Sequence, residues 1–168
     1  MKNPKLIVLA AIVLVAFVGG WLWAGKAPAG TNGPAAAVTG NGVQVVMYQN
    51  PSCGCCGKWA EHMRQAGFEV EVHKTPELND IKRREGITAE FAACHTAYVD
   101  GYIVEGHVPA ADVARMLQER PAIKGIATPG MPAGSPGMEG EWADDYDVVA
   151  FDGEGTTSVF SSHRASSR

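Results

Sequence analysis

Positive charge is scarce in most of this 168-residue chain. The sequence has 14 Lys and Arg residues against 18 Asp and Glu residues, and three of the lysines precede residue 42. The longest basic run is the triplet Lys82–Arg84. Nucleic-acid-binding surfaces neutralise phosphates with clustered Lys and Arg side chains. The lack of such clusters argues against DNA and RNA as partners.

The chain also lacks internal repeats and any compositional bias strong enough to place it outside the globular proteins. Hydrophobic residues make up 46% of the sequence and charged residues 19%, close to the average for globular proteins. This composition excludes wholesale disorder, a collagen-like repeat and a polytopic membrane protein. The length suffices for one ordinary domain and is too short for two large ones.

One long hydrophobic run is present, at the start of the chain. Leu6–Ala24 contains no charged residue and follows Lys2 and Lys5, which is the arrangement of an export sequence. As a helix it would span roughly 28 Å, about the hydrocarbon thickness of a bilayer. A cleaved signal peptide and an uncleaved inner-membrane anchor both fit this run. In either case the positive-inside rule predicts that the rest of the chain is exported to the periplasm.

The sequence after this run divides into a linker and one folded body. Residues 25–42 are rich in Gly, Ala and Pro and have no hydrophobic period, which is typical of a flexible linker. We therefore expect a signal peptide or signal-anchor helix over residues 1–24 and a linker over 25–42. A folded domain is expected over 43–162, with a short tail over 163–168.

Seven segments of the body have the hydrophobic pattern of a strand or a helix. In the order strand, helix, strand, helix, strand, strand and helix, they are Val43–Tyr48, Gly57–Ala66, Phe68–His73, Thr75–Glu85, Thr96–Val99, Tyr102–Glu105 and Pro109–Glu119. This order predicts an α/β domain with a thioredoxin-like fold: the first two strands are parallel, and the last two form a hairpin across Asp100 and Gly101. Ala122–Gly140 is predicted to be an irregular loop, and Tyr146–Asp152 and Thr156–Ser161 a terminal hairpin.

The cysteines carry the chemistry that the sequence indicates. Cys53 and Cys56 are in C-x-x-C register directly after the first strand, the redox position of a thioredoxin-like fold. Unpaired N–H groups and the helix dipole stabilise a thiolate there, which makes it both a nucleophile and a metal ligand. We expect Cys53 to be the more exposed sulfur and Cys56 to be tucked into the helix, and both to be the catalytic residues of any redox reaction.

A simple dithiol leaves the other two cysteines unexplained. Cys55 adds C-x-C and C-C spacings, and Cys94 precedes the third strand, where the predicted fold returns to the C-x-x-C loop. All four sulfurs are therefore expected to converge. Thiolates packed this densely select Cu(I), zinc or an iron–sulfur cluster. Two structural disulfides are the plainer alternative, which the adjacency of Cys55 and Cys56 disfavours.

Histidine and methionine extend the candidate ligand set. His107 follows the fourth strand in a loop expected beside the cysteines, and its imidazole suits copper or zinc. Met131 and Met138 lie in a Pro- and Gly-rich loop, and their thioethers suit Cu(I). His95 adjoins Cys94, and one of these two neighbours is expected to point away. An ordinary loop histidine and gap-filling methionines are the alternative interpretation. No function is assigned to the other three histidines: His62, His73 and His163.

With these motifs in place, the chain resembles the exported copper-handling CopG family, which shares only its name with a plasmid repressor. The resemblance covers about Val43 to Phe160. It rests on four motifs in this order: Tyr48–Trp59 (YQNPSCGCCGKW), Cys94–Ala97 (CHTA), Gly101–Pro109 (GYIVEGHVP) and Pro129–Met138 (PGMPAGSPGM).

The resemblance implies a thioredoxin-like protein of the bacterial cell envelope with a role in copper resistance. It further implies that the four cysteines bind copper, for which a multinuclear copper–thiolate cluster is one form, and that the bound copper changes between Cu(I) and Cu(II). His107 and Met131 are carried over as further ligands. Copper efflux proteins and periplasmic copper carriers are the expected protein partners.

Three alternatives from other classes stay open. A plain thiol–disulfide oxidoreductase needs only Cys53 and Cys56, and a copper chaperone needs no redox change. Kinship with arsenate-reductase-like proteins rests on Tyr48–Cys53, which is similar to their nucleophile loop, but those cytoplasmic enzymes do not need a cysteine triplet. Whether the copper chemistry amounts to enzymatic turnover also stays open.

Overall fold

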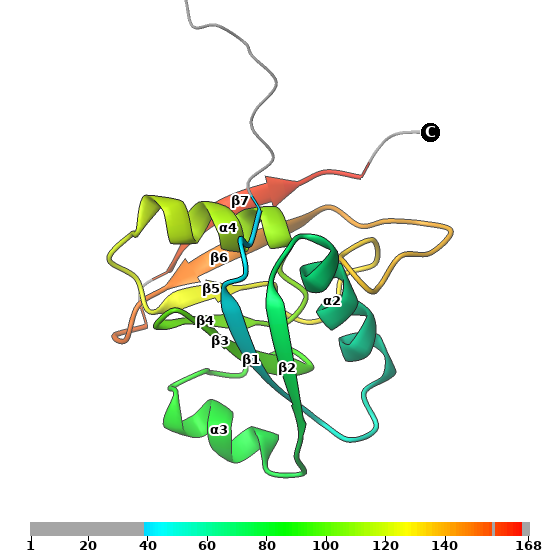
Figure 1. Cartoon of the computed structure of the whole chain (residues 1–168). Coiled ribbons are helices and arrows are strands. Elements are labelled where there is room, and N and C mark those ends of the chain that lie inside the picture. The colour runs from blue at the N-terminus through cyan, green and yellow to red at the C-terminus, as the bar shows by residue number, and fades with distance from the viewer. Residues whose placement is uncertain (1–38, 156, 166–168) are drawn as a thin grey trace, which may run out of the picture. The chain divides into compact units, whose positions relative to one another are not determined.

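The computed structural model describes residues 39–155 and 157–165 of the chain (Figure 1). Within these residues, no helix is both long and apolar enough to cross a membrane. The hydrophobic run Leu6–Ala24, most of the expected linker and the last three residues lie outside them. The export segment therefore stays a prediction.

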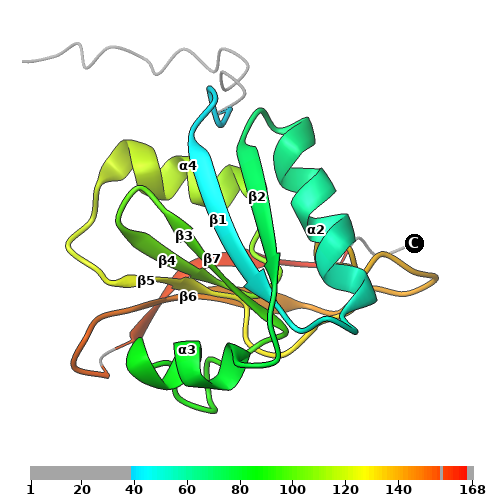
Figure 2. The same cartoon turned by 60° about the horizontal axis from the view of Figure 1, so that its bottom comes forward.

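The described part of the chain contains three helices and seven strands. The helices are α2 (Gly54–Gln65), α3 (Leu78–Arg84) and α4 (Ala110–Glu119). The strands are β1 (Gln44–Gln49), β2 (Glu69–Lys74), β3 (His95–Val99), β4 (Tyr102–Glu105), β5 (Gly125–Ala127), β6 (Tyr146–Phe151) and β7 (Thr157–His163). All seven strands belong to one mixed sheet in the order β2-β1-β3-β4-β5-β6-β7, which Figure 2 displays from a second direction.

The first half of the sheet has the connectivity that the sequence predicts. β1 and β2 are parallel and are joined through α2, whereas β1 pairs with β3 and β3 with β4 in antiparallel register. Asp100 and Gly101 both have positive φ, +47° and +88°, as a two-residue type I′ hairpin requires. The α/β class is confirmed, and the arrangement is compatible with a thioredoxin-like fold.

The region after α4 is more regular than the sequence predicts. β5 lies inside the stretch expected to be irregular, and it pairs in parallel with β4. A Cβ on Gly125 would come within 2.1 Å of the Ile103 carbonyl oxygen, so this close approach of β5 to β4 requires glycine at position 125. The terminal hairpin is confirmed, since β6 and β7 pair in antiparallel register. β7 ends at His163, two residues later than expected.

Hydrophobic cores lie on both faces of the sheet. α2 and α4 pack against one face through side chains that include Trp59, Met63 and Val113. α3 lies on the other side of the sheet from α4 (Figure 1). There Phe91 and Phe151 stack with ring centroids 5.8 Å apart. Full burial of such side chains contributes roughly 1.5–3 kcal/mol each.

Three motifs of the sequence meet at one end of the sheet. The last residue of β1, Gln49, pairs with the first residue of β3, His95. The next residue of β3, Thr96, pairs with Glu105 at the end of β4. The cysteine loop follows β1, Cys94 precedes β3, and the loop of His107 follows β4. Strand pairing alone therefore brings these three loops together.

Candidate metal centre

A turn built by Asn50 connects β1 to α2. The Oδ1 atom of Asn50 accepts hydrogen bonds from the backbone N–H and the hydroxyl of Ser52, at 3.0 and 2.8 Å. The Asn50 carbonyl accepts the N–H of Cys53 at 3.0 Å, and Cys53 is the N-cap of α2. The helix begins three residues earlier than the sequence predicts. Cys55 and Cys56 therefore lie in its first turn, where free N–H groups and the helix dipole favour thiolates.

Two of the three loop cysteines are joined in this structure. Cys53 and Cys56 form a disulfide with their Cα atoms 5.7 Å apart, whereas Cys55 and Cys94 are free thiols. Cys56 is fully buried and Cys53 is half-buried, as the sequence predicts. The Sγ atom of Cys55 lies 3.6 Å from that of Cys53. The C-x-x-C pair can therefore close while the third thiol of the triplet stays beside it.

Cys94 is held in place by a buried ionic network next to it. The Glu105 carboxylate is fully buried and accepts hydrogen bonds from the N–H of Ala93 at 2.7 Å and the hydroxyl of Thr96 at 2.6 Å. Lys82 of α3 donates to Thr96 at 2.9 Å and forms an ion pair with Glu105. These contacts fix the backbone immediately before Cys94.

His107 meets Cys94 in a defined tautomer. Nδ1 of the buried imidazole lies 2.6 Å from the carbonyl oxygen of Pro136. A carbonyl oxygen can only accept, so we assign the ring hydrogen to Nδ1. Nε2 then accepts the thiol hydrogen of Cys94, 2.8 Å away, and it presents the lone pair that a metal ion requires. The structure thus brings His107 to the cysteines, as the sequence predicts.

His95, for which the sequence indicates no ligand role of its own, also lies at the site. It is fully buried, its Nδ1 lies 3.4 Å from the Sγ atom of Cys94, and its ring centroid lies 4.4 Å from that of Trp59. The expectation that either Cys94 or His95 points away is wrong. Cys94 precedes β3, so the alternation of side chains along a strand does not govern it. Among the described residues, Nε2 of His95 has no hydrogen-bond partner, which leaves this atom available to an ion.

The Pro- and Gly-rich loop packs onto the first turns of α2. Pro136 and Gly137 are buried, and Gly137 has a φ of +88°. A Cβ on Gly137 would lie 3.0 Å from both the Cys55 carbonyl oxygen and the Trp59 backbone nitrogen. Glycine is required at this position for both reasons, and the close approach delivers the Pro136 carbonyl to His107.

The two methionines of this loop differ in exposure. Gly130 forms an isolated parallel β-bridge with Ala93, and its N–H donates to the carbonyl oxygen of Ala92 at 3.3 Å. The loop therefore passes next to the residues that precede Cys94. Met131 nevertheless has 52% of its surface exposed, whereas Met138 is half-buried. A ligand role for Met131 stays a prediction.

Six side chains could hold a metal ion, in two overlapping sets. One set has four sulfurs and the other two sulfurs and two imidazoles: Cys53, Cys55, Cys56 and Cys94; and Cys56, Cys94, His95 and His107. Within each set the ligand atoms lie within 4.8 Å of one another. Such donors fit Cu(I) and Zn(II). Because the disulfide occupies two of the sulfurs, both sets are complete only in the reduced protein.

Burial keeps these groups neutral when no ion is bound. It raises the pKa of Cys94 to about 12, and the neighbouring Cys55 thiol adds to the rise. Burial also lowers the pKa of His107. For His95, burial and the charges of His107 and Lys82 hold the pKa well below its usual value. An entering cation therefore meets neutral imidazoles and thiols whose protons it must displace.

The other described histidines have structural partners. Nε2 of His62 accepts the N–H of the first residue of α4 at 3.0 Å. His163 pairs with the buried Asp112 at 2.7 Å, and His73 lies 2.8 Å from Glu71. The sequence assigns no function to these three histidines, and none of them belongs to a ligand set found in the described residues.

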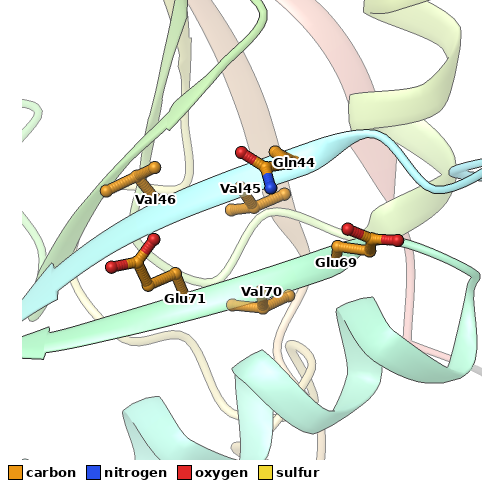
Figure 3. Close-up of a pocket in the computed structure, with 6 residues that line it drawn as sticks. All are labelled: Gln44, Val45, Val46, Glu69, Val70 and Glu71. Atoms are coloured by element: carbon orange, nitrogen blue, oxygen red, sulfur yellow. The ribbon is translucent and has the colours of Figure 1, made fainter.

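A shallow groove of about 170 Å³ runs along β1 and the edge strand β2 (Figure 3). The residues that line it are Gln44, Val45, Val46, Glu69, Val70 and Glu71. Glu69 and Glu71 are exposed, and charged side chains on an edge strand discourage pairing with another chain. This groove contains no sulfur and no imidazole, so it is not the candidate site.

The fold and the site together define a mixed α/β domain with a candidate metal centre lined by sulfur and imidazole. A family model described as "Protein of unknown function, DUF411" matches residues 91–138. Two solved structures match, "Copper resistance protein copG- Form 1" and "Copper resistance protein copG- Form 2". Their identities are 40% and 41%, each with a TM-score of 0.69 over 73% of this chain and 98% of the other. No curated protein matches. The chain belongs to the CopG family.

Proposed function

We propose that this protein binds Cu(I) through its four cysteines and interconverts Cu(I) and Cu(II) in copper resistance. The observation that carries the proposal is the convergence of four sulfur atoms within 4.8 Å of one another. Thiolates select Cu(I) over harder cations. The two structural relatives, both named copper resistance proteins, support copper over zinc as the metal.

The proposed binding step is the collection of Cu(I) at the N-terminus of α2 by the reduced protein. Thiolates this close together can each bridge two ions, so we propose a multinuclear copper–thiolate cluster. His107 presents its Nε2 lone pair 2.8 Å from Cys94 and adds an imidazole ligand. Met131 is proposed as an outer thioether ligand from the neighbouring loop.

The proposed redox step uses the same sulfurs. Cys53 and Cys56 each give one electron to a Cu(II) ion, the two sulfurs join as a disulfide, and two Cu(I) ions and two protons result. In the reverse step, two Cu(I) ions each give one electron to the disulfide, which takes up two protons and opens to two thiols, and two Cu(II) ions result. Because the disulfide removes two ligands, the oxidised site retains fewer ions, and copper release is coupled to oxidation.

A thiol–disulfide oxidoreductase is the second candidate. The closed disulfide between Cys53 and Cys56 at the start of a helix favours it. In that function Cys55 and Cys94 would be spectators, and the protein would reduce insulin rapidly in the absence of metal.

We further propose that the protein works in the periplasm and exchanges copper with carriers or efflux proteins there. The uncharged run Leu6–Ala24 behind Lys2 and Lys5 supports export. Cell fractionation tests this step: recovery of the chain in the cytoplasm would contradict it.

The decisive experiment is anaerobic loading of the reduced full chain with Cu(I), with copper counted per chain and visible and EPR spectra followed during oxidation. More than one Cu(I) ion per chain, followed by a Cu(II) signal, supports the proposal. Binding without any redox change would indicate a simple carrier. One ion or none, with rapid disulfide formation, would indicate the oxidoreductase. Cys55→Ser is the matched variant, and if it binds as much copper as the parent, the third thiol of the triplet has no role.

A further inference from the structure

Two thiols are left over when the C-x-x-C disulfide is closed, and they lie next to each other. Cys55 is in the first turn of α2 and Cys94 directly precedes β3. Their sulfur atoms lie within 4.8 Å of each other. Both side chains are half-buried, and neither takes part in the redox step proposed above.

We infer that Cys55 and Cys94 are a second redox couple, which closes into a disulfide in addition to Cys53–Cys56. The reduced chain then delivers four electrons to Cu(II), one from each of its four cysteines. This inference rests on the proposed copper function and adds to it the number of electrons that the site stores.

Closing this bond requires one of the two sulfurs to move. Cys94 follows Ala93, whose N–H is bound at 2.7 Å to the buried Glu105 carboxylate, so its backbone is fixed. Cys55 is half-buried in the first turn of α2, and its Sγ atom lies 3.6 Å from that of Cys53. A disulfide requires its sulfurs about 2.05 Å apart. We expect this movement to be a rotation about χ1 of Cys55, because a change between staggered positions displaces Sγ while the backbone stays in place.

A proton acceptor is already in contact with this couple. The Cys94 thiol donates to Nε2 of His107 at 2.8 Å. Two Cu(II) ions take one electron each as the two S–H bonds break and the S–S bond forms. The Cys94 proton leaves through His107 and the Cys55 proton leaves directly to solvent. With the first couple, the balance is four thiols and four Cu(II) ions giving two disulfides, four Cu(I) ions and four protons.

The second couple has a consequence for copper release. After the first disulfide has closed, the sulfurs of Cys55 and Cys94 are the two that remain free, and Cys94 also lies within 4.8 Å of ligand atoms of His95 and His107. Closing the second disulfide leaves only the imidazoles. Complete oxidation therefore dismantles the sulfur ligand set and sets free the Cu(I) that it has produced.

The test counts electrons with a Cu(I) chelator. The reduced, metal-free full chain is mixed anaerobically with excess copper(II) sulfate and bathocuproine disulfonate, which traps Cu(I) as a coloured complex. We expect four Cu(I) ions per parent chain. Two double variants are the matched pair, Cys53→Ser/Cys56→Ser and Cys55→Ser/Cys94→Ser. Each keeps one couple, and each is expected to yield two Cu(I) ions per chain and to stay monomeric on a non-reducing gel.

Peptide mapping identifies the bond. Cys53, Cys55 and Cys56 precede Lys58, whereas Cys94 lies between Arg84 and Arg115, so trypsin separates Cys94 from the triplet. The oxidised Cys53→Ser/Cys56→Ser protein should show its two cysteine peptides joined.

Two Cu(I) ions from the parent, with a Cys94 thiol that maleimide still labels, would overturn the inference. So would a Cys53→Ser/Cys56→Ser variant that yields no Cu(I) or only disulfide-linked dimers. The proposed function fails separately, when the reduced parent binds no Cu(I) in the absence of the chelator.

Discussion

Two buried polar clusters lie at the same end of the sheet, on adjacent residues of β3. The first joins Thr96 to Lys82 and Glu105, and the second joins His95 to Cys94 and His107. Adjacent residues of a strand point to opposite faces, so the two clusters lie on opposite sides of the sheet. Because the two clusters lie so close together, the difference in their residues indicates a difference in role.

The two clusters differ in whether their polar atoms have partners. The Glu105 carboxylate accepts from Ala93, Thr96 and Lys82, and the charges of Lys82 and Glu105 oppose each other. In the second cluster, Nε2 of His95 has no hydrogen-bond partner among the described residues. A fully partnered cluster stabilises the fold, whereas an incomplete one has capacity left for a ligand.

Removing Cys94 should have the largest effect on the incomplete cluster, because its sulfur belongs to both ligand sets. In Cys94→Ser we expect more than half of the bound Cu(I) to be lost. The free energy of unfolding of the reduced, metal-free chain should change by about 1 kcal/mol or less, since a serine hydroxyl can still donate to His107. Anaerobic Cu(I) titration against a competing chelator measures the first quantity and urea denaturation the second. Unchanged copper capacity would mean that Cys94 is not a ligand.

Breaking the ion pair should instead affect the fold. Lys82→Met leaves the buried Glu105 without its counter-charge, which should lower the free energy of unfolding by about 3–5 kcal/mol. The double variant Lys82→Met/Glu105→Gln removes both charges and keeps an acceptor for the Ala93 N–H, so it should recover most of the loss. Urea denaturation of both variants checks this. Equal stabilities of the single and double variants would show that the charge is not what matters.

The loop that orients His107 provides a finer test. In Gly137→Ala the added Cβ pushes the loop away from α2 and withdraws the Pro136 carbonyl from Nδ1 of His107. We expect an affinity for Cu(I) about 10-fold lower, because loss of a partner that orients a ligand typically costs about 10–100-fold. Competition with a chelator of known affinity measures it.

Gly155→Ala is the matched control for this substitution. Gly155 has nearly the same φ, +89°, but a Cβ there meets open space. Both variants should lose about 1 kcal/mol of stability from the strained backbone. Gly137→Ala should lose more, because its Cβ also crowds the backbone of α2, and only this variant should lose affinity for Cu(I). Equal affinity losses would attribute the effect to stability alone.

The smallest expected effect concerns pH and lies outside both clusters. Burial lowers the pKa of His62, against an opposing effect of Glu139, so the unfolded chain binds this proton more readily than the folded one. The stabilising contribution is therefore complete above the unfolded pKa of about 6.5 and is lost as the pH falls from there through the lowered pKa of the folded state. Protonation also ends the hydrogen bond that Nε2 accepts from the first N–H of α4.

His62→Gln keeps an acceptor and removes the titration. Between neutral pH and mildly acidic pH, the parent should lose more stability than this variant, as urea denaturation at several pH values would measure. The lowered pKa values of the buried His95 and His107 also reduce stability at acidic pH, and they do so equally in the parent and in the variant. The contribution of His62 is therefore the difference between the two profiles of stability against pH. Parallel profiles would contradict the assignment to His62.

Local patterns predict most of the first half of the fold. The Asp100-Gly101 turn forms as expected because both residues tolerate positive φ, and the strand and helix patterns up to α4 recur within a few residues of their expected bounds. β5 was not predictable, because a three-residue strand has too few residues for a period. It depends on Gly125 fitting against Ile103.

The candidate site likewise contains residues whose role local patterns predict and one residue, His95, for which they do not. The C-x-x-C register and the cysteine triplet lie within a few residues of one another, so their chemistry is visible in the sequence. Cys94 and His107 could be expected beside them because the strand order of a thioredoxin-like fold, which the sequence predicts, places their loops next to the cysteine loop. His95 could not, because the conformation of the residue before β3 depends on the Glu105 network rather than on strand alternation.

By itself, the sequence determined which groups a site could use: sulfurs at the start of a helix, the imidazole of His107 in a further motif, and an uncharged run at the front. The tertiary structure alone decided that both His95 and His107 meet Cys94, that the Pro136 carbonyl selects the tautomer of His107, and that Cys55 and Cys94 face each other. The physical reason is the distance along the chain over which each feature is decided. Residue type, helix start and turn depend on near neighbours in the chain, whereas tautomer, burial and sulfur–sulfur distances arise from contacts between segments that only the folded sheet brings together.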